Sequence, residues 1–260
     1  MNGKWRRAAG ELLRGLGGEP AVVLCGGSAL LVLSHFQGSP TFFRQHLAWV
    51  GSGSGTALAS VAGALPYFWW FGMSLLLYLV APLALARATG GSFTRSYGMG
   101  LGDWPVGVRL AGTLLAVMLP VVWLASRTAA FRGQYPLAGP PAYQLWAGAK
   151  EARASVGLFA AYEAAYFAYF VGWEFFFRGW MLNGLLPAFG RAGAVLVPTV
   201  PFVLMHLGKP EPEALGAVVA GVALGVLALR TRSFWYGAVL HGVVAVWMDV
   251  VSAFPYLGRP

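Results

Sequence analysis

Four residues in the C-terminal half of the chain have the types and the spacing that chemistry requires: Glu174, Arg178, His206 and His241. Glu174 and Arg178 stand four residues apart, so on a helix they share one face, with the acid N-terminal as an ion pair favours. All four lie in apolar and aromatic runs. A charged group at the centre of a bilayer costs roughly 2.5 to 3.5 kcal/mol on insertion scales, so such groups face a bundle interior and pair or react there. One buried carboxylate and two buried imidazoles therefore form the candidate chemical centre.

The spacing around Gly190 predicts that two of these groups lie at one depth. Gly190 indicates a turn, and Glu174 lies 16 residues before it while His206 lies 16 residues after it. An antiparallel pair of helices folded at this turn brings Glu174 and His206 level with each other. His241 lies nine residues beyond the next predicted turn, at Arg232, and so also falls in the interior.

These residue types allow two chemistries. Glu174 and one histidine can activate, as general base, a water that attacks a peptide carbonyl, while the second histidine or a neutral donor stabilises the oxyanion. Alternatively, Glu174, His206 and His241 form a zinc site with an open position for water. The sequence has no H-E-x-x-H motif, so the metal ligands would come from three separate helices. The residues alone leave both chemistries open.

The composition places this centre in a membrane protein. Of 260 residues, 58% are hydrophobic and 10% are charged, whereas a soluble domain carries about 25% charged residues. The net charge of +9 comes from basic residues scattered between apolar runs, and a nucleic-acid partner would require a basic stripe or patch. Cys25 is the only cysteine, which excludes an internal disulfide and a thiolate metal site. The expected partner is therefore the lipid bilayer, with no nucleic acid.

The apolar runs predict an all-α, polytopic membrane bundle of about seven transmembrane helices. The fourth run would be about 45 Å long at 1.5 Å per residue, so it must tilt or project beyond the bilayer. The predicted spans cover residues 20–36, 61–86, 106–125, 156–186, 193–207, 214–229 and 234–254.

The basic residues predict a cytoplasmic N-terminus. With seven spans, 11 of the 18 Lys and Arg fall on the cytoplasmic side and the other 7 outside, as the positive-inside rule favours. The chain has no isoleucine and has 15 Arg against 3 Lys, a bias that indicates a GC-rich genome and hence a bacterial inner membrane. The cytoplasmic set is Lys4, Arg6, Arg7, Arg14, Arg87, Arg95, Arg109, Arg178, Arg191, Arg230 and Arg232.

Three motifs, taken in order, carry a family resemblance. Glu174-x-x-x-Arg178, then Phe202-x-x-x-His206, then His241 on a later helix resemble the CPBP intramembrane protease family. That family includes the type II CAAX prenyl endopeptidases and the bacteriocin-processing and immunity proteins. The resemblance implies an all-helical membrane fold and cleavage of substrates near the membrane by a water that the glutamate and histidine motifs activate. Metal dependence is described for some members.

The resemblance extends over about residues 154–252 and implies two regions. Residues 1–153 would form an N-terminal membrane region with about three spans, and residues 154–260 a catalytic helical core. Carried over to this sequence, Glu174 and His206 would activate the water, His241 would bind the oxyanion or a metal, and Arg178 would hold the glutamate. The expected substrate is a membrane-embedded or membrane-associated protein.

Two positions depart from the family pattern. The usual first of two adjacent glutamates is Trp173, and the usual Asn or Asp four residues after the last histidine is Ala245. Two other acids, Glu163 and Asp249, are predicted to form a second polar layer nearer the outer surface.

The sequence therefore predicts an intramembrane endopeptidase. Trp173 and Ala245 support an alternative, a catalytically inactive family member that acts as a membrane binding or immunity partner. A third hypothesis is a transporter or ion-conducting bundle in which Glu163, Glu174 and Asp249 relay protons.

Overall fold

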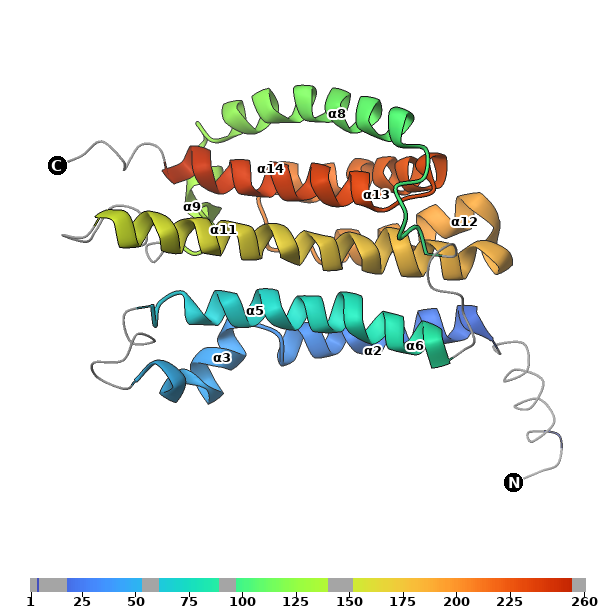
Figure 1. Ribbon diagram of the computed structural model, residues 1–260, viewed down its shortest axis with the longest axis horizontal. Coiled ribbons are helices and arrows are strands. Elements are labelled where there is room, and N and C mark those ends of the chain that lie inside the picture. Colours follow the sequence, from blue (N-terminus) through green and yellow to red (C-terminus); the bar gives the residue numbers. More distant parts are fainter. Residues whose placement is uncertain (1–3, 5–17, 53–60, 89–96, 140–151, 254–260) are drawn as a thin grey trace.

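The computed structural model describes residues 4, 18–52, 61–88, 97–139 and 152–253, and the regular elements among them are helices (Figure 1). This confirms the all-α prediction. Four of the basic residues on which the predicted membrane orientation rests lie outside the described residues: Arg6, Arg7, Arg14 and Arg95. The α-helices are α2 (Glu19–Phe36), α3 (Pro40–His46), α5 (Leu65–Leu75), α6 (Ala81–Ala88), α8 (Trp104–Ala125), α9 (Ala129–Gln134), α11 (Ala152–Glu174), α12 (Leu182–Leu204), α13 (Glu211–Thr231) and α14 (Trp235–Ala253). The remaining elements are the 3₁₀-helix η1 (Ala48–Gly51) and the π-helices η2 (Leu76–Val80) and η3 (Phe175–Met181).

Among the described residues, six helical segments are long and apolar enough to cross a membrane, so the chain is a multi-pass membrane protein. The sequence predicts about seven spans, and the difference lies in one segment, residues 157–204, which is 48 residues long and holds the fourth and fifth predicted spans.

The segment 157–204 is not one straight rod, because the chain turns at Gly190. Gly190 has φ 63° and ψ −178°, a conformation that glycine adopts without steric cost. Beyond the turn, the ring centre of Phe202 lies 5.9 Å from that of Trp173 and 5.5 Å from that of Phe177. The end of α12 has therefore folded back along α11 and η3, as the spacing around Gly190 predicts.

Helix α11 lies in the middle of the bundle, packed against α14 on one side and α5 on the other (Figure 1). Its tyrosines Tyr162, Tyr166 and Tyr169 recur every three or four residues, so they share one helix face. All three are buried, and their ring centres lie 5.1 to 5.9 Å from that of Phe71 on α5. Aromatic pairs at such distances contribute about 0.5–1.5 kcal/mol each beyond the area they bury. This aromatic layer fixes the helix that ends at Glu174.

Glycines let neighbouring helices approach the helix that carries His241. A Cβ added at Gly107 on α8 would lie 2.3 Å from the ring of Tyr236 on α14, and one at Gly242 on α14 would lie 2.7 Å from Phe167 on α11. Small residues at such crossings are typical of helix packing in membranes. They set α14 between α8 and α11.

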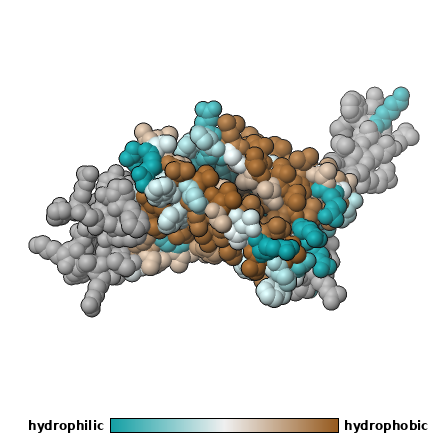
Figure 2. Space-filling view, turned by 90° about the horizontal axis from the view of Figure 1, so that it is seen from above, coloured by the Kyte–Doolittle hydropathy of each residue, from teal (hydrophilic) through white to brown (hydrophobic). Residues whose placement is uncertain are grey.

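The outer surface of the bundle is apolar. Side chains such as Val219 (72% exposed) and Leu215 (63% exposed) on α13 face outward, and Figure 2 shows apolar residues over most of the middle of the visible face, with hydrophilic residues toward its ends. Such a surface suits a surrounding of lipid.

Candidate active site

Glu174 is the last residue of α11, where the chain passes into the π-helix η3. Its side chain is fully buried. Oε1 accepts hydrogen bonds from Arg178 Nη1 at 3.1 Å and from His241 Nδ1 at 2.7 Å. Oε2 is also buried and has no hydrogen-bond partner among the residues that the structure describes. A single oxygen thus joins the acid to both an arginine and a histidine.

Arg178 neutralises this buried carboxylate. The residue is 3% exposed, and its Nη2 also donates to the carbonyl oxygen of Gly221 on α13 at 3.4 Å. Its guanidinium carbon lies 4.1 Å from the centre of the Phe202 ring, within the range of a cation–π interaction. Because an uncompensated buried charge destabilises a protein strongly, Arg178 explains how Glu174 is tolerated. The predicted i, i+4 ion pair forms, although a π-helix begins between its two residues.

His241 is held in one tautomer by Glu174. A carboxylate only accepts hydrogen bonds, so Nδ1 of His241 carries the proton and donates, and Nε2 is the acceptor of the neutral ring. The ring packs on Phe170 with centres 4.2 Å apart. The acid and the imidazole stand in the relation found in hydrolytic triads, where the carboxylate orients the histidine and stabilises its protonated form.

His206 lies just beyond the end of α12, and its Nδ1 is 2.7 Å from the carbonyl oxygen of Phe202. That carbonyl accepts, so here too Nδ1 donates and Nε2 is the acceptor. The ring centres of His206 and His241 lie 6.5 Å apart, with the rings within 19° of parallel. Burial lowers the pKa of His206 to about 4, so the ring is neutral at pH 7. The structure thus brings Glu174, His241 and His206 to one place.

Trp173 completes the site. Its ring centre lies 6.1 Å from that of His206 and 6.4 Å from that of His241. The residue is 4% exposed, and its indole N–H has no acceptor within the described part of the chain. A buried donor without an acceptor costs about 1–3 kcal/mol. In the sequence, the signal for this residue is its place directly before Glu174, where the motif has an acid.

Glu163 on α11 and Asp249 on α14 are 8% and 0% exposed, and their carboxyl groups interact electrostatically. Asp249 Oδ1 accepts a hydrogen bond from the backbone N–H of Leu137 at 2.8 Å. The structure brings the two predicted acids together, and Asp249 anchors the segment after α9. A part for either in the chemistry stays a prediction.

A polar cluster that the sequence does not reveal lies at the end of the bundle beside His206. Lys209 Nζ donates to the Tyr135 hydroxyl at 3.0 Å, and that hydroxyl donates to Glu213 Oε1 at 2.7 Å. Burial lowers the pKa of Lys209 and, together with Glu213, raises the pKa of Tyr135. The three residues tie the end of α9 to the connection between α12 and α13. They come from segments 74 and 78 residues apart, so no local pattern marks them.

The donor set does not fit the zinc site considered from the sequence. In the described ranges, no three His, Cys, Asp or Glu side chains are placed to hold one metal ion. Oε1 of Glu174 accepts from Arg178 and from Nδ1–H of His241, so the donors left to a metal ion here are Nε2 of each histidine and Oε2 of Glu174, and these do not converge on one point. Hydrogen bonds and the ion pair suffice to explain how these side chains are held.

Residues 155–247 match the family model described as Rce1-like, type II CAAX prenyl endopeptidase Rce1-like. Among curated proteins and among solved structures, no match to the chain was found. The family match confirms the resemblance that the three motifs carry. The matched region contains most of α11, all of α12 and α13, and most of α14. It therefore includes the helices that position the site. The division of the chain at residues 153 and 154 stays a prediction.

Proposed function

From the Rce1-like domain at residues 155–247, we propose that this chain is an intramembrane endopeptidase. It would hydrolyse a peptide bond of a membrane-embedded or membrane-associated protein. The observation that carries the proposal is the 2.7 Å contact between His241 Nδ1 and Oε1 of the fully buried Glu174. This contact gives a membrane-buried imidazole a fixed tautomer and a partner for the charge it gains on taking a proton.

In this proposal, Nε2 of His241 takes a proton from a water molecule as the water oxygen attacks the peptide carbonyl carbon. Glu174 stabilises the imidazolium that forms, and Arg178 holds Glu174. His241 then returns the proton to the leaving amine as the peptide bond breaks. His206, neutral and with Nε2 as an acceptor, would orient the water by accepting its second hydrogen. The proton is thus taken up and released at one atom.

The developing oxyanion needs a donor, and Trp173 is our candidate. The family motif supplies an Asn or Asp four residues after the last histidine, but Ala245 has no polar side chain. His241 Nδ1 already donates to Glu174 and His206 Nδ1 to Phe202. The indole N–H of Trp173 is a buried donor without an acceptor in the described residues, and its ring contacts both histidines. Such donors act where charge develops.

The same tryptophan favours a second candidate function. Its ring lies against His206 and His241 and is almost fully buried, so it can occupy the space that a substrate would need. The chain would then be a catalytically inactive family member that binds a membrane partner.

The test compares peptide termini of membrane-associated proteins, by mass spectrometry, in cells that carry the wild-type chain or a variant at equal abundance. We expect termini that are present with the wild type and vanish with Glu174→Gln and with His241→Gln. Matched controls are Glu211→Gln and His35→Gln, because Glu211 and His35 are exposed and lie outside the site. Identical termini with all five chains would favour the inactive binding partner.

A further inference from the structure

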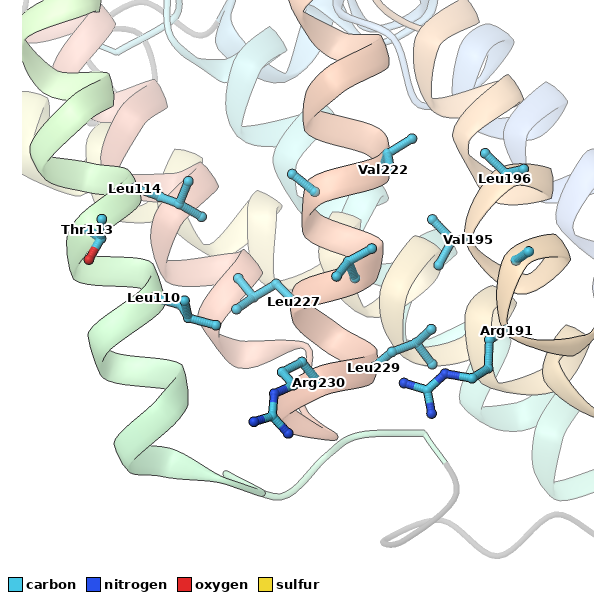
Figure 3. Close-up of a pocket in the computed structure, with 13 residues that line it drawn as sticks. Leu110, Thr113, Leu114, Arg191, Val195, Leu196, Val222, Leu227, Leu229 and Arg230 are labelled. Atoms are coloured by element: carbon cyan, nitrogen blue, oxygen red, sulfur yellow. The ribbon is translucent and has the colours of Figure 1, made fainter.

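A second candidate site lies outside the cluster of residues around Glu174. Helices α8, α12 and α13 border an open apolar cavity of about 810 Å³ (Figure 3). Its walls are formed by aliphatic side chains, among them Leu110, Leu114, Val195, Leu196, Val222 and Val226. A cavity with such walls accepts a hydrocarbon chain, and this one belongs to helices that cross the membrane.

Two arginines line one end of this cavity. Arg191 stands directly after the turn at Gly190, and Arg230 is the penultimate residue of α13. Figure 3 shows both guanidinium groups toward the same end of the groove, with Leu229 between them. Both residues are exposed, and neither forms an ion pair within the described part of the chain. Two cations without an acidic partner therefore stand where the helices leave the apolar layer.

We propose that this groove binds one anionic glycerophospholipid, with its phosphate between Arg191 and Arg230 and an acyl chain between α8, α12 and α13. Guanidinium groups bind phosphate oxygens in pairs of parallel hydrogen bonds. Val222 and Arg230 are eight residues apart on α13, about 12 Å along the helix axis, so the apolar walls extend well below the headgroup level. Basic pockets between membrane helices bind lipid headgroups in this way.

The two positive charges at one end of the groove favour an anionic lipid over other apolar ligands. A peptide or a second copy of the chain could fill an apolar groove, but either would need a carboxylate placed at the end where Arg191 and Arg230 meet, whereas a phospholipid carries its phosphate beside its acyl chains. A zwitterionic lipid would fill the apolar walls equally well and gain less from the two arginines. An anionic lipid satisfies both ends of the site.

The test uses the purified full chain and two lipids with identical acyl chains, phosphatidylglycerol and phosphatidylcholine, with bound lipid measured by native mass spectrometry. The wild type is expected to prefer phosphatidylglycerol by about 25-fold, from roughly fivefold for each arginine near an anionic surface. The double variant Arg191→Gln/Arg230→Gln should lose this preference. The control Arg44→Gln/Arg132→Gln removes two exposed arginines from another part of the molecule and should keep it.

A third variant tests the groove itself. Val226 is 54% exposed, so Val226→Trp fills the groove without entering the core, and it should reduce retention of both lipids. Equal binding of the two lipids by the wild type, or a preference that survives Arg191→Gln/Arg230→Gln, would overturn the proposal. Unchanged retention of both lipids by Val226→Trp would show that the arginines attract lipid as a surface patch. It would overturn the proposal that an acyl chain lies in the groove. A dimer that Val226→Trp dissociates would assign the groove to a second copy instead.

Discussion

The ion pair of Arg178 and Glu174 offsets the free-energy cost of burying a carboxylate in the bundle. Arg178→Met removes the guanidinium and leaves a buried carboxylate without its counter-charge, so we expect destabilisation by about 3–5 kcal/mol. Adding Glu174→Gln should recover a large part of this loss, because it removes the unpaired charge as well. Unfolding of the single and double variants in detergent, followed by circular dichroism, measures the coupling. If the two losses simply add, the pair does not stabilise the fold in this way.

His206 gives the molecule an acid-sensitive position. Its pKa is lowered to about 4 by burial, whereas an exposed histidine has a pKa of about 6.5. Between these values the unfolded chain binds a proton and the folded chain does not, so stability falls as the pH drops from 6.5 to 4 and is unaffected above 6.5. We expect His206→Gln to lose less stability than the wild type over this window. Unfolding curves at pH 7, 5.5 and 4 measure the difference, and parallel losses would contradict it.

Trp173 separates the two candidate functions. Trp173→Phe keeps an aromatic ring in the site and removes the indole N–H. If that N–H stabilises the oxyanion, kcat falls roughly a hundredfold while KM changes little. If Trp173 only fills the site, the change leaves activity the same or raises it. Rates on a substrate peptide found in the terminus experiment decide this, and Trp69→Phe serves as a control because Trp69 lies on α5 and its indole N–H donates to the Gln37 carbonyl.

At the scale of elements, the approach of α14 to Glu174 depends on a glycine. A Cβ added at Gly237 would lie 3.0 Å from Glu174 Oε2, whereas one at Gly216 on α13 would meet nothing within 4 Å. Helix propensity alone favours alanine over glycine by about 0.5–1 kcal/mol at both positions. Gly237→Ala should nevertheless lower activity, because the carboxylate must move, and Gly216→Ala should not. Equal activities with equal stabilities would show that the close approach at Gly237 has no functional consequence.

The π-helix η3 is the element that the sequence could not predict. Glu174 and Arg178 pair at the i, i+4 spacing expected of an α-helix, yet residues Phe175–Met181 form a π-helix in which every side chain is buried. Single π-turns in helices are often found at functional sites. The aromatic run Phe175 to Phe177 has no periodicity that distinguishes the two helix types, because all of its faces are buried. The tertiary contacts of the run, not its local propensity, settle the conformation.

At the scale of the molecule, counting residues predicted how two parts of the site meet, which the motifs alone did not. The equal sequence distances from Gly190 predicted that Glu174 and His206 lie at one depth in the bundle. The structure places His206 beside Trp173, the residue directly before Glu174. The sequence could not show that Glu174 would contact His241 in place of His206, since that depends on the rotation of α14 about its axis. It also gave no sign of the Tyr135 cluster, whose members meet only after the bundle has formed.

The orientation of the whole molecule in the membrane stays a prediction, and the fold allows a sharp test. Ser52, after η1, and Ala188, beside the turn at Gly190, are exposed, and the elements beside them, α3 and α12, lie at opposite ends of the bundle (Figure 1). The positive-inside rule assigns the end with Ala188 to the cytoplasm, because Arg191 and Arg230 lie there. The natural Cys25 is exposed on α2, so the test begins from Cys25→Ser.

In that background, a membrane-impermeant maleimide should label Ser52→Cys in intact spheroplasts and Ala188→Cys only after permeabilisation. Both substitutions are small and lie on the surface, so neither should disturb packing. The opposite labelling pattern would show that the molecule has the inverse orientation, with its N-terminus outside. It would also move Arg191 and Arg230 to the outer leaflet, and the anionic lipid proposed for their groove would then have to come from that side of the membrane.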